Sequence, residues 1–152
     1  GRGASLATVL DLAARVENLV AIKDATGDVS RAAEIVAASS DDFVLYSGDD
    51  SLTLPLLSVG ATGVIAVASH WAGEAMGEMI AAYKAGDVAK AQAINEGLLP
   101  SWRFEGSDAA PNPIPAKAAC RALGLKVGQC RLPLGDCPPE VDAAAKALVA
   151  QR

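Results

Sequence analysis

The chain has 152 residues, of which 51% are apolar and 20% are charged, a composition typical of a globular protein rather than a disordered one. Thirteen Lys and Arg residues against eighteen Asp and Glu residues give a net charge of −5. Because a nucleic-acid-binding protein needs a basic surface, this charge balance argues against a nucleic-acid partner.

The cysteines form no recognisable disulfide or metal-binding pattern. Cys120, Cys130 and Cys137 are odd in number and have no CxxC spacing, and the only histidine, His70, lies fifty residues before the first of them. Zinc sites and disulfide frameworks both have characteristic spacings that are missing here. We therefore expect no metal site, three reduced thiols and a cytoplasmic protein, since disulfides are rare in that compartment.

One uncharged stretch, between Asp50 and Glu74, has the length of a membrane span. However, Pro55, Gly60 and Gly63 interrupt it, and several hydroxyl side chains are scattered through it. We interpret the stretch as a buried helix, a glycine turn and a buried strand, and we expect no membrane association. The first residues also lack the unbroken apolar core of a secretory signal.

Three short apolar runs predict β-strands over residues 19–23, 43–47 and 63–68. The runs are continuous rather than alternating, which is typical of parallel strands buried on both faces. Each is followed by a turn and then a helical pattern, as βα units require. Helices are expected over 7–16, 29–38, 52–59 and 73–85, with Asp28 or Ser30 as the N-cap of the second.

Three parallel strands alone would leave two sheet edges and one apolar face uncovered. The pattern therefore predicts an α/β fold that is the C-terminal part of a TIM (β/α)8 barrel, with its last three βα units; a whole barrel has about 250 residues. We expect residues 1–86 to form this partial barrel and residues 87–152 to form a helical appendage. The appendage should contain helices over 88–99, ended by Pro100, over 116–123, and from Pro138 to Ala150.

Lys23 is the residue with the clearest chemical implication. Because side chains alternate along a strand, it shares a face with two alanines, whereas Val20, Ile22 and Asp24 share the opposite face. The β-branched pair suits the face under the helices, so Lys23 should face the barrel interior, where desolvation favours the neutral, nucleophilic amine. Active sites of these barrels lie at the C-terminal ends of the strands, where Lys23 is placed. The alternative is a lysine paired with Asp24 or with another carboxylate at a strand end.

Five sequence runs resemble one enzyme family, in the same order. Residues 18–28 (NLVAIKDATGD) resemble the strand with the Schiff-base lysine in the dihydrodipicolinate synthase and N-acetylneuraminate lyase superfamily. Together the five runs extend the resemblance from residue 18 to the end of the chain. The other four are SGDD (47–50), GATGVIAVASH (60–70), NPIPAKAA (112–119) and RLPL (131–134).

The resemblance implies a TIM barrel in which Lys23 forms an imine with pyruvate. The derived enamine would add to aspartate semialdehyde and give 4-hydroxy-tetrahydrodipicolinate, in the diaminopimelate route of lysine biosynthesis. Because the iminium itself accepts electrons, no metal or organic cofactor is implied. The resemblance also implies a homotetramer built from barrel dimers.

The resemblance assigns three more residues to the substrates. Gly48 and Ile65 match positions that line the pyruvate pocket, and Arg2 is the only candidate for the arginine that meets the carboxylate of the aldehyde. From the residues alone, Gly48 is equally a turn glycine with positive φ, and Ile65 a core residue. The family's catalytic tyrosine and paired threonines precede this chain, so we expect the chain alone to be inactive and to need the N-terminal half.

Several alternatives stay open. A related pyruvate-dependent aldolase or lyase for sugar acids fits the same runs, as does a non-catalytic half barrel that assembles with another chain. Asp49 and Asp50 are interpreted as helix caps rather than metal ligands. His70 is interpreted as a hydrogen-bonded structural residue rather than a proton-transfer group.

Overall fold

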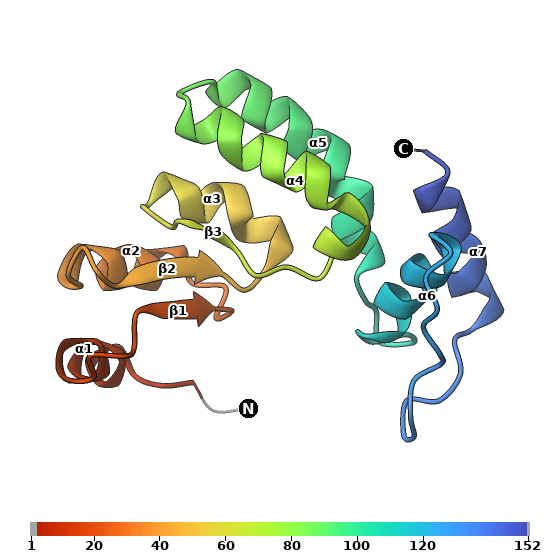
Figure 1. Ribbon diagram of the computed structural model, residues 1–152, viewed down its shortest axis with the longest axis horizontal. Helices are drawn as coiled ribbons and strands as arrows, with labels where there is room; N and C mark the ends of the chain where they lie inside the picture. Colours follow the sequence, from red (N-terminus) through yellow and green to blue (C-terminus); the bar gives the residue numbers. More distant parts are fainter. Residues whose placement is uncertain (1–2, 152) are drawn as a thin grey trace. The chain divides into compact units, whose positions relative to one another are not determined.

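The computed structural model describes residues 3–151, and the contacts among them divide the chain into two compact units. The first unit covers the residues up to 66 together with 83–86, and the second covers residues 67–82 and those from 87 onward. Figure 1 shows the helices and strands of both units in chain order. Most of the helix that follows the third strand thus groups with the C-terminal helices.

A three-stranded parallel sheet forms the centre of the first unit, as the sequence predicts. Its strands run in the order β1-β2-β3, and Tyr46 of the central strand pairs with Lys23 on one side and with Gly63 on the other. Consecutive parallel strands at adjacent positions are the arrangement expected of successive βα units. The strands are β1 (Ala21–Asp24), β2 (Val44–Ser47) and β3 (Gly63–Val64).

The third strand is shorter than the apolar run 63–68 predicts. Ile65 still donates its backbone N–H to the Ser47 carbonyl oxygen at 2.9 Å. Because β2 ends at Ser47, the chain beyond Ile65 has no strand residue on that side with which to continue the ladder. The length of an apolar run therefore overestimates the length of a strand when the neighbouring strand is short.

The helices of the first unit pack on one face of this sheet (Figure 1). Ile22 of β1 packs against their shared core, as its predicted face requires, but Val20 lies before the strand and is 59% exposed. Asp28 caps the second helix by accepting the Arg31 N–H at 2.9 Å. The helices are α1 (Leu6–Arg15), α2 (Val29–Ala38), the 3-10 turn η1 (Asp50–Leu52) and α3 (Thr53–Ser58), and the core contains Val9, Ala32, Ile35, Phe43, Leu45, Leu56 and Ala61.

The second unit is helical. Its first helix has a non-helical residue, Ala72 (φ −123°, ψ 15°), so the regular helix begins close to the predicted start at residue 73. Within residues 3–151, no helix combines the length and the apolar character that crossing a membrane requires. The helices are α4 (Ser69–Lys84), whose last two residues group with the first unit, α5 (Val88–Phe104), α6 (Ile114–Ala122) and α7 (Pro139–Val149).

The prediction that Pro100 ends its helix is wrong, because α5 continues to Phe104. Proline removes one backbone hydrogen bond and crowds the preceding turn, which disfavours a helix interior. Here tertiary contacts hold the last turn in place. The Trp71 indole N–H donates to the Ser101 hydroxyl at 3.1 Å, and the Trp71 ring meets the Phe104 ring edge-on with centroids 5.8 Å apart.

An ion pair links α6 to α7 in the second unit. Arg121 donates to the Asp142 carboxylate at 2.6 Å, and this hydrogen bond holds the pKa of Asp142 below its usual value. A carboxylate with a lowered folded-state pKa contributes stability above its unfolded pKa of about 3.9, and this contribution is lost as the pH falls through the folded-state pKa. The pair is partly exposed, so we expect a contribution of at most about 1 kcal/mol.

Asp142→Asn should therefore lower the urea midpoint at about pH 7, and the effect should be smaller at about pH 2, because protonation of Asp142 removes the ion pair progressively as the pH falls. Fluorescence of Trp71 and Trp102 reports on the second unit, to which both belong. Asp108→Asn is the matched control, because Asp108 is exposed and has no ion pair with any residue of the described chain. An equal loss at both pH values would contradict the assignment.

The three cysteines, Cys120, Cys130 and Cys137, are all free. Thiol titration in denaturant without reductant should therefore count three groups, and a count of one would show a disulfide. In the native protein Cys120 should react last, because it is 6% exposed. Burial also raises the pKa of Cys137, which lowers its thiolate fraction, so we expect Cys130 to react first.

Candidate active site

The side chain of Lys23 lies at the C-terminal end of β1, on the face of the sheet opposite the helices of the first unit. Lys23 is exposed, whereas the next residue, Asp24, is buried on the helix side and interacts with Arg31 of α2. Among the described residues Lys23 has no ion-pair partner. The interpretation of Lys23 as the partner of Asp24 is therefore wrong, since the carboxylate points the other way.

Gly48 lies directly beside Lys23, at the end of β2. A Cβ atom at this position would lie 2.7 Å from the Ala25 Cβ, 3.0 Å from the Asp24 carbonyl oxygen and 3.0 Å from the Lys23 Cε. The Gly48 N–H also donates to the Asp24 oxygen at 2.7 Å. Gly48 is not among the glycines with positive φ, so the turn-glycine interpretation is wrong and close packing is the reason for glycine here.

Ile65 follows β3 at the same end of the sheet. Its side chain is 48% exposed, which rules out core packing within the described chain. Its N–H bonds to Ser47, the residue before Gly48, so Lys23, Gly48 and Ile65 lie at the C-terminal ends of three adjacent parallel strands. The fourth candidate, Arg2, lies outside the described residues.

Beneath Lys23, Thr26 and Arg31 surround the carboxylate of Asp24, which is 5% exposed. Its Oδ1 accepts the Thr26 N–H at 2.8 Å and the Thr26 hydroxyl at 2.6 Å, and its Oδ2 lies 3.6 Å from the Arg31 Nε. We did not predict this cluster from the sequence, although the alternation of side chains along the strand already placed Asp24 under the helices. A buried carboxylate needs a partner, and the first turn of the next helix offers an arginine.

The two neighbouring aspartates behave differently. Asp49 caps η1, since its carboxylate accepts the Ser51 N–H at 3.0 Å and the Ser51 hydroxyl at 2.8 Å. This confirms the cap at Asp49, whereas Asp50 is the first residue of that turn and is 1% exposed. Within the described chain, no group of three or more His, Cys, Asp or Glu side chains could hold a metal ion.

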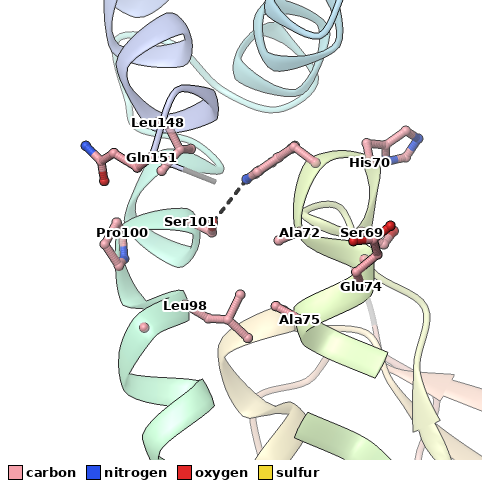
Figure 2. A pocket seen from close by; sticks show the side chains of 13 residues that line it. Ser69, His70, Ala72, Glu74, Ala75, Leu98, Pro100, Ser101, Leu148 and Gln151 are labelled. Carbon is pink, nitrogen blue, oxygen red and sulfur yellow. Dashed lines mark hydrogen bonds between the residues drawn. The ribbon is translucent and has the colours of Figure 1, made fainter. Parts of the chain in front are cut away.

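His70 belongs to the second unit, at the start of α4. Its Nδ1 lies 2.9 Å from the Val67 carbonyl oxygen, which supports the structural interpretation of this residue. The same turn borders a cavity of about 650 Å³, which also contacts α5 and the end of α7 (Figure 2). None of the first-unit candidates Lys23, Gly48 and Ile65 lines this cavity, so its size does not identify the reactive site.

The arrangement around Lys23 is suited to covalent carbonyl chemistry. A primary amine attacks a ketone or aldehyde carbon and loses water to form an imine, which requires an accessible amine and space for the carbonyl compound. Lys23 is exposed on the side of the sheet away from the helices, and glycine at position 48 lets the end of β2 approach the Lys23 Cε closely.

The model of the dihydrodipicolinate synthetase family matches residues 1–152 of this chain. A relative from Bacillus subtilis, 4-hydroxy-tetrahydrodipicolinate synthase, is 50% identical over 135 residues, covering 86% of this chain and 45% of that protein. The chain thus spans about half the length of the curated relatives it matches.

Solved structures agree with this likeness. The crystal structure of a dihydrodipicolinate synthase from Bacillus anthracis has a TM-score of 0.89 and 44% identity, covering 97% of this chain and 50% of that one. A chloride-inhibited dihydrodipicolinate synthase from Acinetobacter baumannii, complexed with pyruvate, has a TM-score of 0.84 and 33% identity, covering 96% of this chain and 49% of that one. The family match extends over the whole sequence. The chain therefore belongs to the dihydrodipicolinate synthetase family.

Proposed function

We propose that this chain carries the imine-forming lysine of an enzyme that condenses pyruvate with aspartate semialdehyde to 4-hydroxy-tetrahydrodipicolinate, in lysine biosynthesis. The observation that carries the proposal is the position of Lys23, exposed at a strand end and packed beside Gly48, in a chain that matches the family throughout. Two similar proteins support the choice of substrates: the Bacillus subtilis relative is named for the proposed product, and the Acinetobacter baumannii structure is complexed with pyruvate.

In the proposed reaction, the neutral Lys23 amine attacks the ketone carbon of pyruvate, and one water leaves as the imine forms. Loss of a methyl proton gives an enamine, whose carbon forms a bond with the aldehyde carbon of aspartate semialdehyde. The amino group of that substrate then attacks the imine carbon, so the ring closes and the lysine amine leaves. The protonated imine accepts the electron pair when the methyl proton leaves and when the amino group attacks, the aldehyde oxygen accepts it when the carbon–carbon bond forms, and no cofactor takes part.

In this proposal residues 1–86 complete a TIM barrel with preceding strands, and residues 87–152 form a helical region outside it. The sheet supports the proposal, because β1 and β3 each have a strand neighbour on one side only among the described residues. Gly48 and Ile65 would contact pyruvate, and Arg2 the carboxylate of the aldehyde. We also propose that the enzyme is a cytoplasmic homotetramer of barrel dimers and that the chain alone does not turn over its substrates.

Borohydride trapping tests this function. The chain is fused behind the N-terminal half of one of the synthases above, treated with pyruvate and borohydride, and digested for mass spectrometry. We expect one reduced pyruvate adduct, on Lys23, because reduction of the imine makes it permanent. The unfused chain, treated in parallel, should show little adduct.

An adduct on Lys84, Lys90 or Lys117 instead of Lys23 would overturn the mechanism. Condensation of pyruvate with a sugar aldehyde but not with aspartate semialdehyde would assign the chain to the aldolase alternative. Absence of any adduct, in a fusion that circular dichroism shows to be folded, would favour the non-catalytic half barrel.

A further inference from the structure

Asp24 occupies an unusual position, next to Lys23 in the chain but on the other face of the sheet. Its carboxylate binds Thr26 and Arg31 on the helix side, and its carbonyl oxygen accepts the Gly48 N–H at 2.7 Å. A single residue thus connects the turn after β1, the helix α2 and the end of β2. The site already described uses none of these side-chain contacts.

We propose that Asp24, held by Arg31, is a positioning residue that sets the end of β1 against Gly48 and thereby places the Lys23 amine. The proposal rests on the proposed function of Lys23. Because side chains alternate along a strand, the Asp24 carboxylate cannot reach the amine and acts through the backbone. The Lys23 side chain passes so close to Gly48 that a Cβ there would lie 3.0 Å from its Cε, so a small shift of either strand end displaces the amine.

The ion pair between Asp24 and Arg31 is largely shielded from solvent. The side chains of Asp24 and Arg31 are 3% and 18% exposed, and neither Oδ2 nor Nε has a hydrogen bond to another described residue. Each charged group is therefore compensated by the other. If one of them is removed, the remaining buried charge is left without a partner, and it draws in water or moves toward the surface. Either response moves the backbone of residue 24, and with it the hydrogen bond to Gly48.

The first measurement is hydrogen exchange at the Gly48 amide, in the 152-residue chain. In Asp24→Asn and Arg31→Ala we expect exchange to accelerate about tenfold or more, since the bond to the Asp24 oxygen opens more often. Arg31→Lys keeps a cation and should recover part of the protection. Thr26→Val removes one hydroxyl hydrogen bond to Asp24 and should accelerate exchange at Gly48 by a smaller factor. Thr8→Val, in α1, is the matched control and should leave this exchange unchanged.

The second measurement is the rate of borohydride-trapped imine formation at Lys23 in the fused protein. We expect kcat and the trapping rate to fall about a hundredfold in Asp24→Asn, as for a displaced reacting group, with a smaller change in KM for aspartate semialdehyde. Arg31→Lys should retain more of the trapping rate than Arg31→Ala does, because it keeps a cation beside Asp24. A purely structural role would reduce the folded fraction but leave the rate per folded molecule unchanged.

The two measurements separate the proposals. If the unsubstituted fusion forms no adduct at Lys23, the proposed function fails, while Gly48 exchange still tests the link from Asp24 to β2. If the fusion reacts normally but Asp24→Asn and Arg31→Ala trap pyruvate at the original rate, the positioning role is overturned. If both variants fail to fold, Thr26→Val against Thr8→Val decides, and equal rates and equal Gly48 exchange in that pair overturn it.

Discussion

Replacement of Lys23 by alanine should abolish the pyruvate adduct and lower kcat of the fused protein by about 10⁴-fold or more, as loss of a catalytic nucleophile does. The protein should nevertheless fold. Lys23 is exposed and has no ion pair with a described residue, so the substitution should change the free energy of unfolding by no more than about 0.5 kcal/mol. The measurements are steady-state kinetics, urea unfolding and mass spectrometry after borohydride treatment.

Two matched variants sharpen this test. Lys23→Arg keeps the positive charge but offers no neutral amine near neutral pH, so it should be as inactive as Lys23→Ala. Lys90→Ala removes an exposed lysine from α5 and should leave the activity unchanged. If Lys23→Arg retained substantial activity, the amine would act through its charge rather than through an imine, and the mechanism would be wrong.

The orientation of the side chains in β1 could be predicted from the sequence. The two-residue period of a strand predicted which face of the sheet each β1 side chain occupies, and Ile22, Lys23 and Asp24 all follow it. This prediction succeeds because the pattern is local and one face is covered by helices. Val20 departs from it because the strand begins one residue later.

The reason for glycine at position 48 could not be predicted from the residues. It depends on the Ala25 Cβ and the Asp24 carbonyl oxygen, which belong to a different strand end and become neighbours only when β1 and β2 pair. The same applies to Pro100, since a local rule ends the helix there and contacts with Trp71 override it. Predictions therefore failed where a neighbour distant in sequence determines the outcome.

The close packing at Gly48 leads to the second large effect. Gly48→Ala should destabilise the first unit by about 1–3 kcal/mol, the usual cost of overpacking, because its new Cβ meets the Ala25 Cβ at 2.7 Å and the Asp24 carbonyl oxygen at 3.0 Å. Neither atom is the flexible end of a side chain. The Lys23 Cε can move away, but that movement displaces the amine, so we expect imine trapping at Lys23 to slow about a hundredfold.

Gly77→Ala provides the control of opposite sign. Gly77 lies in α4, is exposed, and a Cβ there would meet no atom within 4 Å, so alanine should stabilise the helix by about 0.5–1 kcal/mol. Urea unfolding and the trapping rate are measured for both variants in the fused protein. If Gly48→Ala matched Gly77→Ala in both measurements, the strand ends would have room to separate. Lys23 would then not depend on the tight approach of Gly48 to the end of β1.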